Sequence, residues 1–104
     1  MTRTALLITS LALIATHATA ELDSSRQNEL LYLLKHDCGS CHGMTLKGGL
    51  GPSLLPEALS GKPAGLLVST ILDGRPNTAM PPWKNMLTQG EAEWLTAQLL
   101  RGVQ

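Results

Sequence analysis

The sequence has almost no aromatic residues: phenylalanine is absent, and there are only one tyrosine and two tryptophans. Seventeen leucines between residues 21 and 104 must therefore do most of the packing. Those 84 residues make one domain, which is small for a self-sufficient hydrophobic core. We expect a further large apolar group to complete this core, because the polypeptide alone would be unstable or loosely packed.

An excess of charge and strand-like alternation are also missing. From residue 21 onwards, seven Lys and Arg stand against eight Asp and Glu, so this part of the chain is nearly neutral. Because it has no basic stripe, we do not expect it to bind nucleic acid. No segment alternates apolar and polar residues as a strand does, and no repeat or low-complexity stretch occurs. An all-α domain is the fold class that we predict.

Residues 1–20 have the pattern of a secretory signal peptide. Arg3 gives a short basic start, residues 5–15 are mostly apolar, and Ala18-Thr19-Ala20 is a small-residue cleavage site. The apolar run is too short to span a bilayer, and an uncleaved N-terminal anchor is the alternative. We predict cleavage before Glu21, export to the periplasm, no stable membrane insertion, and a mature domain of residues 21–104.

Both cysteines of the chain lie in the stretch Cys38-Gly39-Ser40-Cys41-His42. This C-x-x-C-H pattern is the attachment motif of c-type haem. The two thiols would form thioether bonds to the two vinyl groups, and the adjacent His42 would bind the iron on one face. A covalently attached haem would also supply the missing apolar plate of the core. We therefore predict one haem c per chain, held by Cys38 and Cys41.

Three other interpretations of this stretch fit the residues less well than haem. A redox dithiol is expected in a βαβ context, and none is visible in this sequence. A zinc site would need a second pair of cysteines. A disulfide between Cys38 and Cys41 would close a very small ring. The immediate His42 and the downstream Met80-Pro81-Pro82 favour haem over all three.

Helical periodicity predicts the first helix over residues 23–36. Ser24 and Gln27 match a capping box at its start, and apolar residues follow at helical spacing. Residues 44–59 are predicted to form an ordered loop that ends in a single helical turn begun by Pro56. The leucines of this loop would wrap the macrocycle: Leu46, Leu50, Leu54 and Leu55.

Two more helices are predicted towards the C-terminus. One covers residues 63–72, with Pro63 in its first turn and a buried stripe of Leu66, Leu67 and Ile71. Residues 74–87 then form a second loop. The last helix spans residues 89–101, with a capping box of Thr88 and Glu91 at its start.

The second face of the haem iron needs a ligand from elsewhere in the chain. His36 lies at the edge of the site and is expected to be solvated or to face the helix dipole. Met44 follows His42 too closely to reach the opposite face. Met80 stands in a loop before two prolines that fix the backbone, whereas core packing explains Met86 beside a helix cap. We predict that Met80 is the ligand and keep Met86 as the alternative.

Several of these stretches resemble the class I cytochromes c of bacteria: Cys38 to His42, Gly51-Pro52-Ser53-Leu54 and Met80-Pro81-Pro82-Trp83. Thr45-Leu46-Lys47-Gly48-Gly49-Leu50-Gly51-Pro52 and Gly74-Arg75-Pro76 are similar to the small cytochrome c55X found with cytochrome cd1 nitrite reductase. The resemblance implies a compact cytochrome c fold whose terminal helices cross near the haem. It also implies that the Pro52 carbonyl bonds the other ring nitrogen of His42. Trp83 would lie near the haem edge or pack in the core.

These features together predict a periplasmic monohaem carrier of single electrons that is not an enzyme. A His/Met pair leaves no open iron position, and Met raises the reduction potential. The resemblance implies a redox protein as partner, with cytochrome cd1 nitrite reductase as the acceptor, and we expect a monomer. Lys47 and Lys84 could rim the exposed haem edge. Two alternatives stay open: an accessory role in d1 haem maturation, and a sensor that binds a gaseous ligand.

Overall fold

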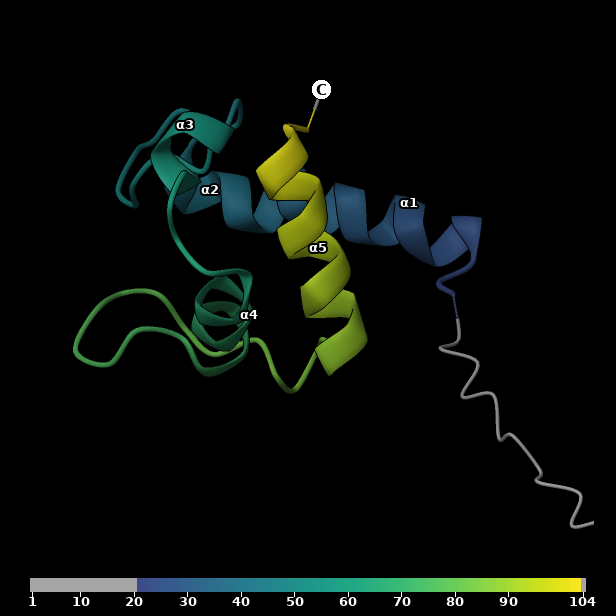
Figure 1. Ribbon diagram of the computed structural model, residues 1–104. Coiled ribbons are helices and arrows are strands. Elements are labelled where there is room, and N and C mark those ends of the chain that lie inside the picture. Colours follow the sequence, from purple (N-terminus) through teal and green to yellow (C-terminus); the bar gives the residue numbers. More distant parts are fainter. Residues whose placement is uncertain (1–20, 104) are drawn as a thin grey trace, which may run out of the picture.

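Figure 1 shows the computed structural model, which describes residues 21–103. The predicted signal peptide, residues 1–20, lies outside the described residues. The elements follow in the order α1 (Ser24–Leu33), η1 (a π-helical turn, Leu34–Cys38), α2 (Gly39–His42), α3 (Pro56–Leu59), α4 (Ala64–Asp73) and α5 (Gln89–Arg101). Residues 21–103 contain no strand, so the predicted all-α class is confirmed.

The first helix differs from the prediction at both of its ends. Asp23 is the capping residue, because its carboxylate accepts a hydrogen bond of 2.8 Å from the Arg26 amide. The predicted capping box of Ser24 and Gln27 is wrong, since the Gln27 side chain donates to the Leu22 carbonyl instead. An aspartate caps a helix as well as a serine does, and here it lies one residue earlier. The helix also continues beyond the predicted end, through η1 and α2 to residue 42.

The later helices agree closely with the prediction. Thr88 Oγ1 accepts from the Glu91 amide (3.2 Å), while the Glu91 carboxylate accepts from the Thr88 amide (2.9 Å), so the capping box of α5 is present. Pro56 occupies the first turn of α3. Pro63 lies one residue before α4 instead of inside it.

The core lies where α1, α5 and the loops between them meet, and Figure 1 shows α5 crossing α1. As expected from the composition, leucines dominate it: Leu30, Leu34, Leu46, Leu59, Leu87, Leu95 and Leu99. Leu67, Ile71, Trp83 and Trp94 are partly buried against this cluster. The prediction for Leu66 is wrong, since its side chain is half-exposed and Val68 is the buried residue of α4. The apolar stripe of α4 therefore begins at Leu67.

An ion pair joins the start of α1 to the start of α5. Arg26 Nε donates to Glu91 Oε1 at 2.7 Å, and Arg26 Nη2 donates to Glu91 Oε2 at 3.2 Å. A second bond runs from Arg26 to the exposed Glu29 on the same helix. Glu91 is 7% exposed, and its hydrogen bonds from Arg26 lower the pKa of its carboxyl group. This pair links the first turns of the two terminal helices.

Candidate haem site

Cys38, Cys41 and His42 lie at the C-terminal end of one continuous helical run, residues 24–42. The π-helical turn Leu34–Cys38, which ends on the first residue of the motif, is a local widening of the helix, a feature that often marks functional sites. Cys38 ends this turn and packs against the leucine core. Its burial, with a smaller contribution from the neighbouring Asp37 carboxylate, raises the pKa of the Cys38 thiol to about 11. Both thiols are free.

The imidazole of His42 is held by Pro52. Its Nδ1 lies 2.7 Å from the Pro52 carbonyl oxygen. A carbonyl oxygen can only accept a hydrogen bond, so Nδ1 must carry the ring proton. The lone pair of Nε2 is then available to a metal, and the bond at Nδ1 orients the ring and increases its basicity. The structure thus brings His42 and Pro52 together as the sequence resemblance implied.

A short backbone segment, residues 48–52, closes over this end of the helix, and we call it the strap. The Gly48 amide donates to the His42 carbonyl, and the Gly51 amide donates to the Cys41 carbonyl, both at 2.8 Å. The Gly49 amide donates to the Gly51 carbonyl at 2.9 Å within the strap. These bonds satisfy carbonyl groups that the end of α2 leaves free. The strap is therefore an ordered part of the site.

The leucines of this loop divide between the core and the surface. Leu46 is buried in the leucine core, and Leu54 and Leu55 pack against it. Leu50, by contrast, is 93% exposed and packs on no part of the leucine core, so its contact with the macrocycle stays a prediction. Leu50 lies at the turn of the strap, where the backbone bonds of its glycine neighbours direct its side chain away from the chain. Leucine spacing alone carries no signal for such a turn.

Met80 has a fixed backbone in the loop between α4 and α5. The Arg75 amide donates to the Met80 carbonyl at 3.2 Å, and the Met80 amide donates to Thr78 Oγ1 at 3.3 Å. Gly74 has a φ of +69° and touches the same segment, because a Cβ there would lie 2.7 Å from the Met80 carbonyl oxygen. Met86 is 61% exposed, so the interpretation of Met86 as a core residue is wrong. Met86 lies in a turn, where its amide donates a hydrogen bond to the Trp83 carbonyl.

The remaining predicted residues lie around this loop or on the helical run. Trp83 is partly buried against the core, and its amide donates to the Ile71 carbonyl at 3.1 Å. Lys84 faces Asp73 across 4.0 Å, and Lys47 is exposed. His36 is exposed and stacks against Tyr32, with ring centroids 4.1 Å apart. An i, i+4 spacing on a helix could have predicted this aromatic pair.

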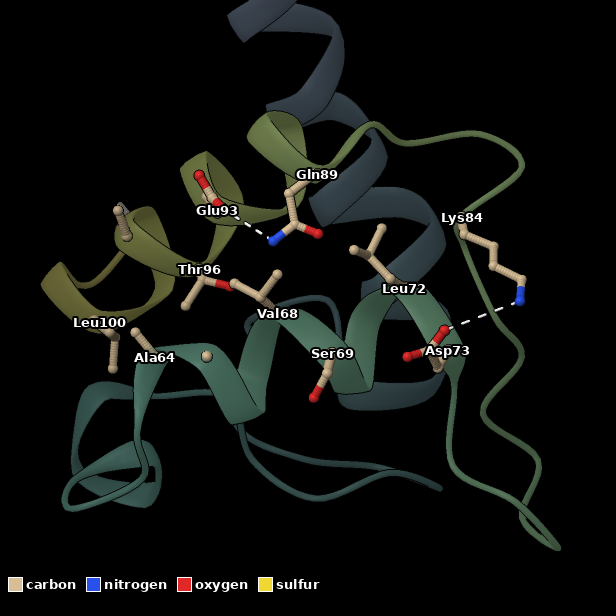
Figure 2. A pocket seen from close by; sticks show the side chains of 12 residues that line it. Ala64, Val68, Ser69, Leu72, Asp73, Lys84, Gln89, Glu93, Thr96 and Leu100 are labelled. Atoms are coloured by element: carbon tan, nitrogen blue, oxygen red, sulfur yellow. Dashed lines mark hydrogen bonds and ion pairs between the residues drawn. The ribbon is translucent and has the colours of Figure 1, made fainter. Parts of the chain in front are cut away.

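A hollow of about 620 Å³ lies between α4 and α5 (Figure 2). Small and aliphatic residues line much of it, and Gln89–Glu93 and Lys84–Asp73 pairs lie along its rim. The hydroxyl oxygen of Thr96 is buried there and has no hydrogen-bond partner among residues 21–103. None of the cysteine, histidine and methionine residues of the predicted site borders this hollow.

The residues of the motif fit a covalently bound haem. Two free thiols and an imidazole with a free Nε2 lie on one helical turn. Within residues 21–103, no three His, Cys, Asp or Glu side chains gather as a bare metal ion would require. A single imidazole would suit an iron that receives most of its other ligands from a macrocycle. Among the same residues, no helix combines the length and the apolar character needed to cross a bilayer.

Comparisons with known proteins agree with this chemistry. Residues 26–98 match the family described as cytochrome C oxidase, cbb3-type, subunit III. The chain is 45% identical to cytochrome c55X of Paracoccus denitrificans, over 97% of this chain and 96% of the relative. The chain belongs to the c-type cytochromes. The solved structure of the c-type cytochrome NirC is similar to this cytochrome, with a TM-score of 0.77 and 56% identity over 78% of this chain and 95% of that one.

One further likeness concerns a larger protein. Dihydro-heme d1 dehydrogenase NirN, solved in complex with DHE, matches this cytochrome with a TM-score of 0.65 and 37% identity. The match covers 70% of this chain but 16% of the dehydrogenase chain. Together the comparisons confirm the predicted family, the small helical cytochrome fold and a covalently bound haem c. They leave the roles of individual side chains to the geometry described above.

Proposed function

We propose that this cytochrome carries single electrons in the periplasm, with haem held by Cys38 and Cys41. His42 and Met80 would be the axial ligands of the iron. The 2.7 Å bond between His42 Nδ1 and the Pro52 carbonyl carries this proposal, because it presents Nε2 as a metal ligand. The braced backbone of Met80 supports the second ligand, since a thioether on a fixed loop can hold a constant position.

The bound haem would supply reversible one-electron chemistry at its iron. What the chain contributes is position and environment. Pro52 orients the imidazole of His42, Gly74 and Thr78 hold the Met80 loop, and the leucine core keeps water away from one side of the motif. If His42 and Met80 both bind the iron, no position on it remains for a substrate. This proposed pair of ligands favours a carrier role over an enzymatic one.

The partner that we propose is a periplasmic cytochrome cd1 nitrite reductase, which would accept the electron. The stretch from Cys38 to Pro56 contains no acidic residue, and Lys47 is its only lysine. A near-neutral surface with the exposed Leu50 suits the small interface of a transient redox pair. Long-range electrostatic steering should then be weak, and the rate of transfer should depend little on salt.

Stopped-flow mixing of the reduced cytochrome with the oxidised reductase tests this partner across a salt series. Leu50→Asp should slow the second-order transfer at least severalfold, because it places a charge in the apolar contact. Leu66→Asp is the matched control, since this exposed leucine lies on α4 outside the strap and should transfer at the rate of the unmodified protein. Charge reversal of Lys47 and Lys84 to Glu should slow transfer without changing the haem spectrum. Absence of transfer at every salt concentration, with a six-coordinate haem, argues against the donor role.

A second candidate function is supported by the likeness to NirN: an accessory role in d1 haem maturation. Oxidation of a dihydro-tetrapyrrole releases two electrons and two protons, so two molecules of a one-electron carrier would be needed for each product. Mixing the oxidised cytochrome with a dihydro-haem d1 dehydrogenase and its substrate separates the two directions of transfer. Reduction of the cytochrome in that mixture, without oxidation by nitrite reductase, would favour maturation.

The compartment and the assembly state belong to the same proposal. We expect cleavage before Glu21 and a monomer, which N-terminal sequencing and light scattering of the exported holoprotein would check. Gas sensing is a separate outcome. Rapid binding of carbon monoxide by the reduced protein would show that Met80 is absent from the iron or easily displaced from it.

A further inference from the structure

Two glycines of the strap are not explained by their backbone conformation. Gly43, Gly48, Gly61, Gly74 and Gly102 have positive φ values, which favour glycine. Gly49 and Gly51 are not among them, so a residue with a side chain could adopt their backbone angles. Another constraint must therefore require glycine at these two positions.

That constraint is the space between the strap and the haem motif. A Cβ added at Gly51 would lie 2.8 Å from both Cε1 and Nδ1 of the His42 ring. A Cβ added at Gly49 would lie 2.8 Å from the Cys41 carbonyl oxygen. Two carbon atoms normally approach to about 3.5–4.0 Å, and a Cβ atom essentially never lies within 3.0 Å of another non-bonded heavy atom. Neither position therefore has room for a methyl group.

The strap cannot simply move back to make room. The Gly48 and Gly51 amides are bonded to the His42 and Cys41 carbonyls at 2.8 Å, so the residue that touches the ring is itself tied to the helix. Gly49, against the Cys41 carbonyl, adds a second close contact to the same helical turn. By contrast, the His42 imidazole can turn about its side-chain bonds. A methyl group at residue 51 would therefore displace the ring from its bond to Pro52.

We propose that Gly51 is a positioning residue for the axial ligand. Its lack of a side chain lets the strap lie against the imidazole, which sets the orientation of the ring and the length of the Nδ1–H bond to Pro52. The inference rests on the proposed role of His42 as an iron ligand. Because the bond at Nδ1 increases the basicity of the ligand, it stabilises the oxidised iron and lowers the reduction potential. Gly51 thus acts on the potential through His42 without touching the cofactor.

The test compares Gly51→Ala with Gly90→Ala in the covalently loaded holoprotein. Gly90 lies in the first turn of α5, and a Cβ there meets no atom within 4 Å, so this control should match the unmodified protein. Gly51→Ala should raise the reduction potential, shift the paramagnetic proton signals of the His42 ring, and move the Nδ1 proton signal towards that of a weaker hydrogen bond. At a fixed ambient potential, we expect the ferrous-to-ferric ratio to rise by up to about tenfold, which corresponds to about 59 mV.

Gly49→Ala is the second variant, in case Gly51→Ala does not accumulate with haem. Its methyl group presses on the Cys41 carbonyl and should shift the turn that carries His42 relative to Pro52, so the potential should rise here too. A merely structural strap would give a different result: lower thermal stability, with the potential and the His42 signals unchanged in either loaded variant. That result would overturn the proposal while leaving His42 as a ligand. If His42 is not a ligand, the unmodified protein itself will lack the ring signals shifted by the iron.

Discussion

Replacement of Glu91 by glutamine tests whether the ion pair between α1 and α5 holds the fold together. The carboxylate accepts hydrogen bonds from Arg26 and from the Thr88 amide, and its side chain is 10% exposed. Glu91→Gln keeps the shape of the side chain but removes the charge. It also turns one acceptor into an NH₂ group that faces donors, so at least one of these bonds is lost.

The expected loss is about 2 kcal/mol in the free energy of unfolding. A hydrogen bond to a charged group contributes about 1.5–3 kcal/mol, and a neutral one about 0.5–1.5 kcal/mol. The Arg26 side chain is 34% exposed, so solvent screens its charge. The contribution of these bonds to the free energy of unfolding therefore lies towards the lower end of these ranges. For a domain of this size, each 1 kcal/mol shifts the thermal midpoint by about 4–8 °C. We therefore expect the midpoint of Glu91→Gln to fall by about 10 °C at neutral pH.

The assay is thermal unfolding of the holoprotein, followed by circular dichroism at several pH values. Arg26 holds the pKa of Glu91 below its ordinary value of 4.5, so the stabilisation is complete above about pH 4.5. It is lost as the pH falls through the lower pKa of the folded state, because the protonated carboxyl group no longer pairs with Arg26. The difference between the unmodified protein and Glu91→Gln should therefore shrink in acid.

Glu29→Gln is the matched control, because Glu29 also pairs with Arg26 at 2.7 Å but its side chain is 62% exposed. This variant should change the midpoint only slightly, as expected for a surface ion pair. Equal effects of the two substitutions would refute the reasoning. So would a difference for Glu91→Gln that stays constant down to the lowest pH at which the protein remains folded.

The other predictions concern the haem and the core. Cys38→Ala and Cys41→Ala should each lose stable holoprotein, as judged by a haem stain after denaturing electrophoresis; full covalent haem in the double variant would contradict the attachment site. Met80→Ala should convert the iron to high spin or to a substitute ligand and lower the potential, whereas the exposed Met86 should tolerate alanine with a change of within about 0.5 kcal/mol. Optical spectra and redox titration compare the two, and loss of the methionine–iron charge-transfer band in Met86→Ala would reverse the choice. Thr96→Val should raise the thermal midpoint, since it removes a buried hydroxyl without a partner that costs about 1–3 kcal/mol.

Local signals in the sequence predicted the elements that depend on neighbouring residues. The capping box of Thr88 and Glu91, the turn begun by Pro56 and the helical spacing of apolar residues in the first helix are patterns within four residues. The haem motif is equally local, which is why residues 38–42 could be recognised at once. The predicted bond between His42 and Pro52 spans ten residues, and only the resemblance to a family indicated it.

What could not be predicted depends on contacts between distant segments. Arg26 and Glu91 are 65 positions apart, and no periodicity links them. Leu50 and Leu66 have the composition of core residues, but a turn and the start of a helix direct them outwards. The glycine at residue 51 looks like an ordinary turn glycine in the sequence. The reason that no larger residue fits at position 51 is its contact with the imidazole of His42, which only the folded structure shows.

Residues 24–42 form one helical run that includes the π-helical turn Leu34–Cys38. Because of this turn, the run contains one residue more than a regular α-helix of the same length in space. This surplus lies among exposed side chains, between the core residue Leu34 and the first haem cysteine. Deletion of Lys35 or His36 would let the turn close into a regular helix while both flanks keep nearly the same phase. An insertion at the same place cannot be absorbed in this way. It would rotate Cys38 and Cys41 by about 100° relative to the buried face of α1. The helix thus tolerates a change of length before the motif in one direction only.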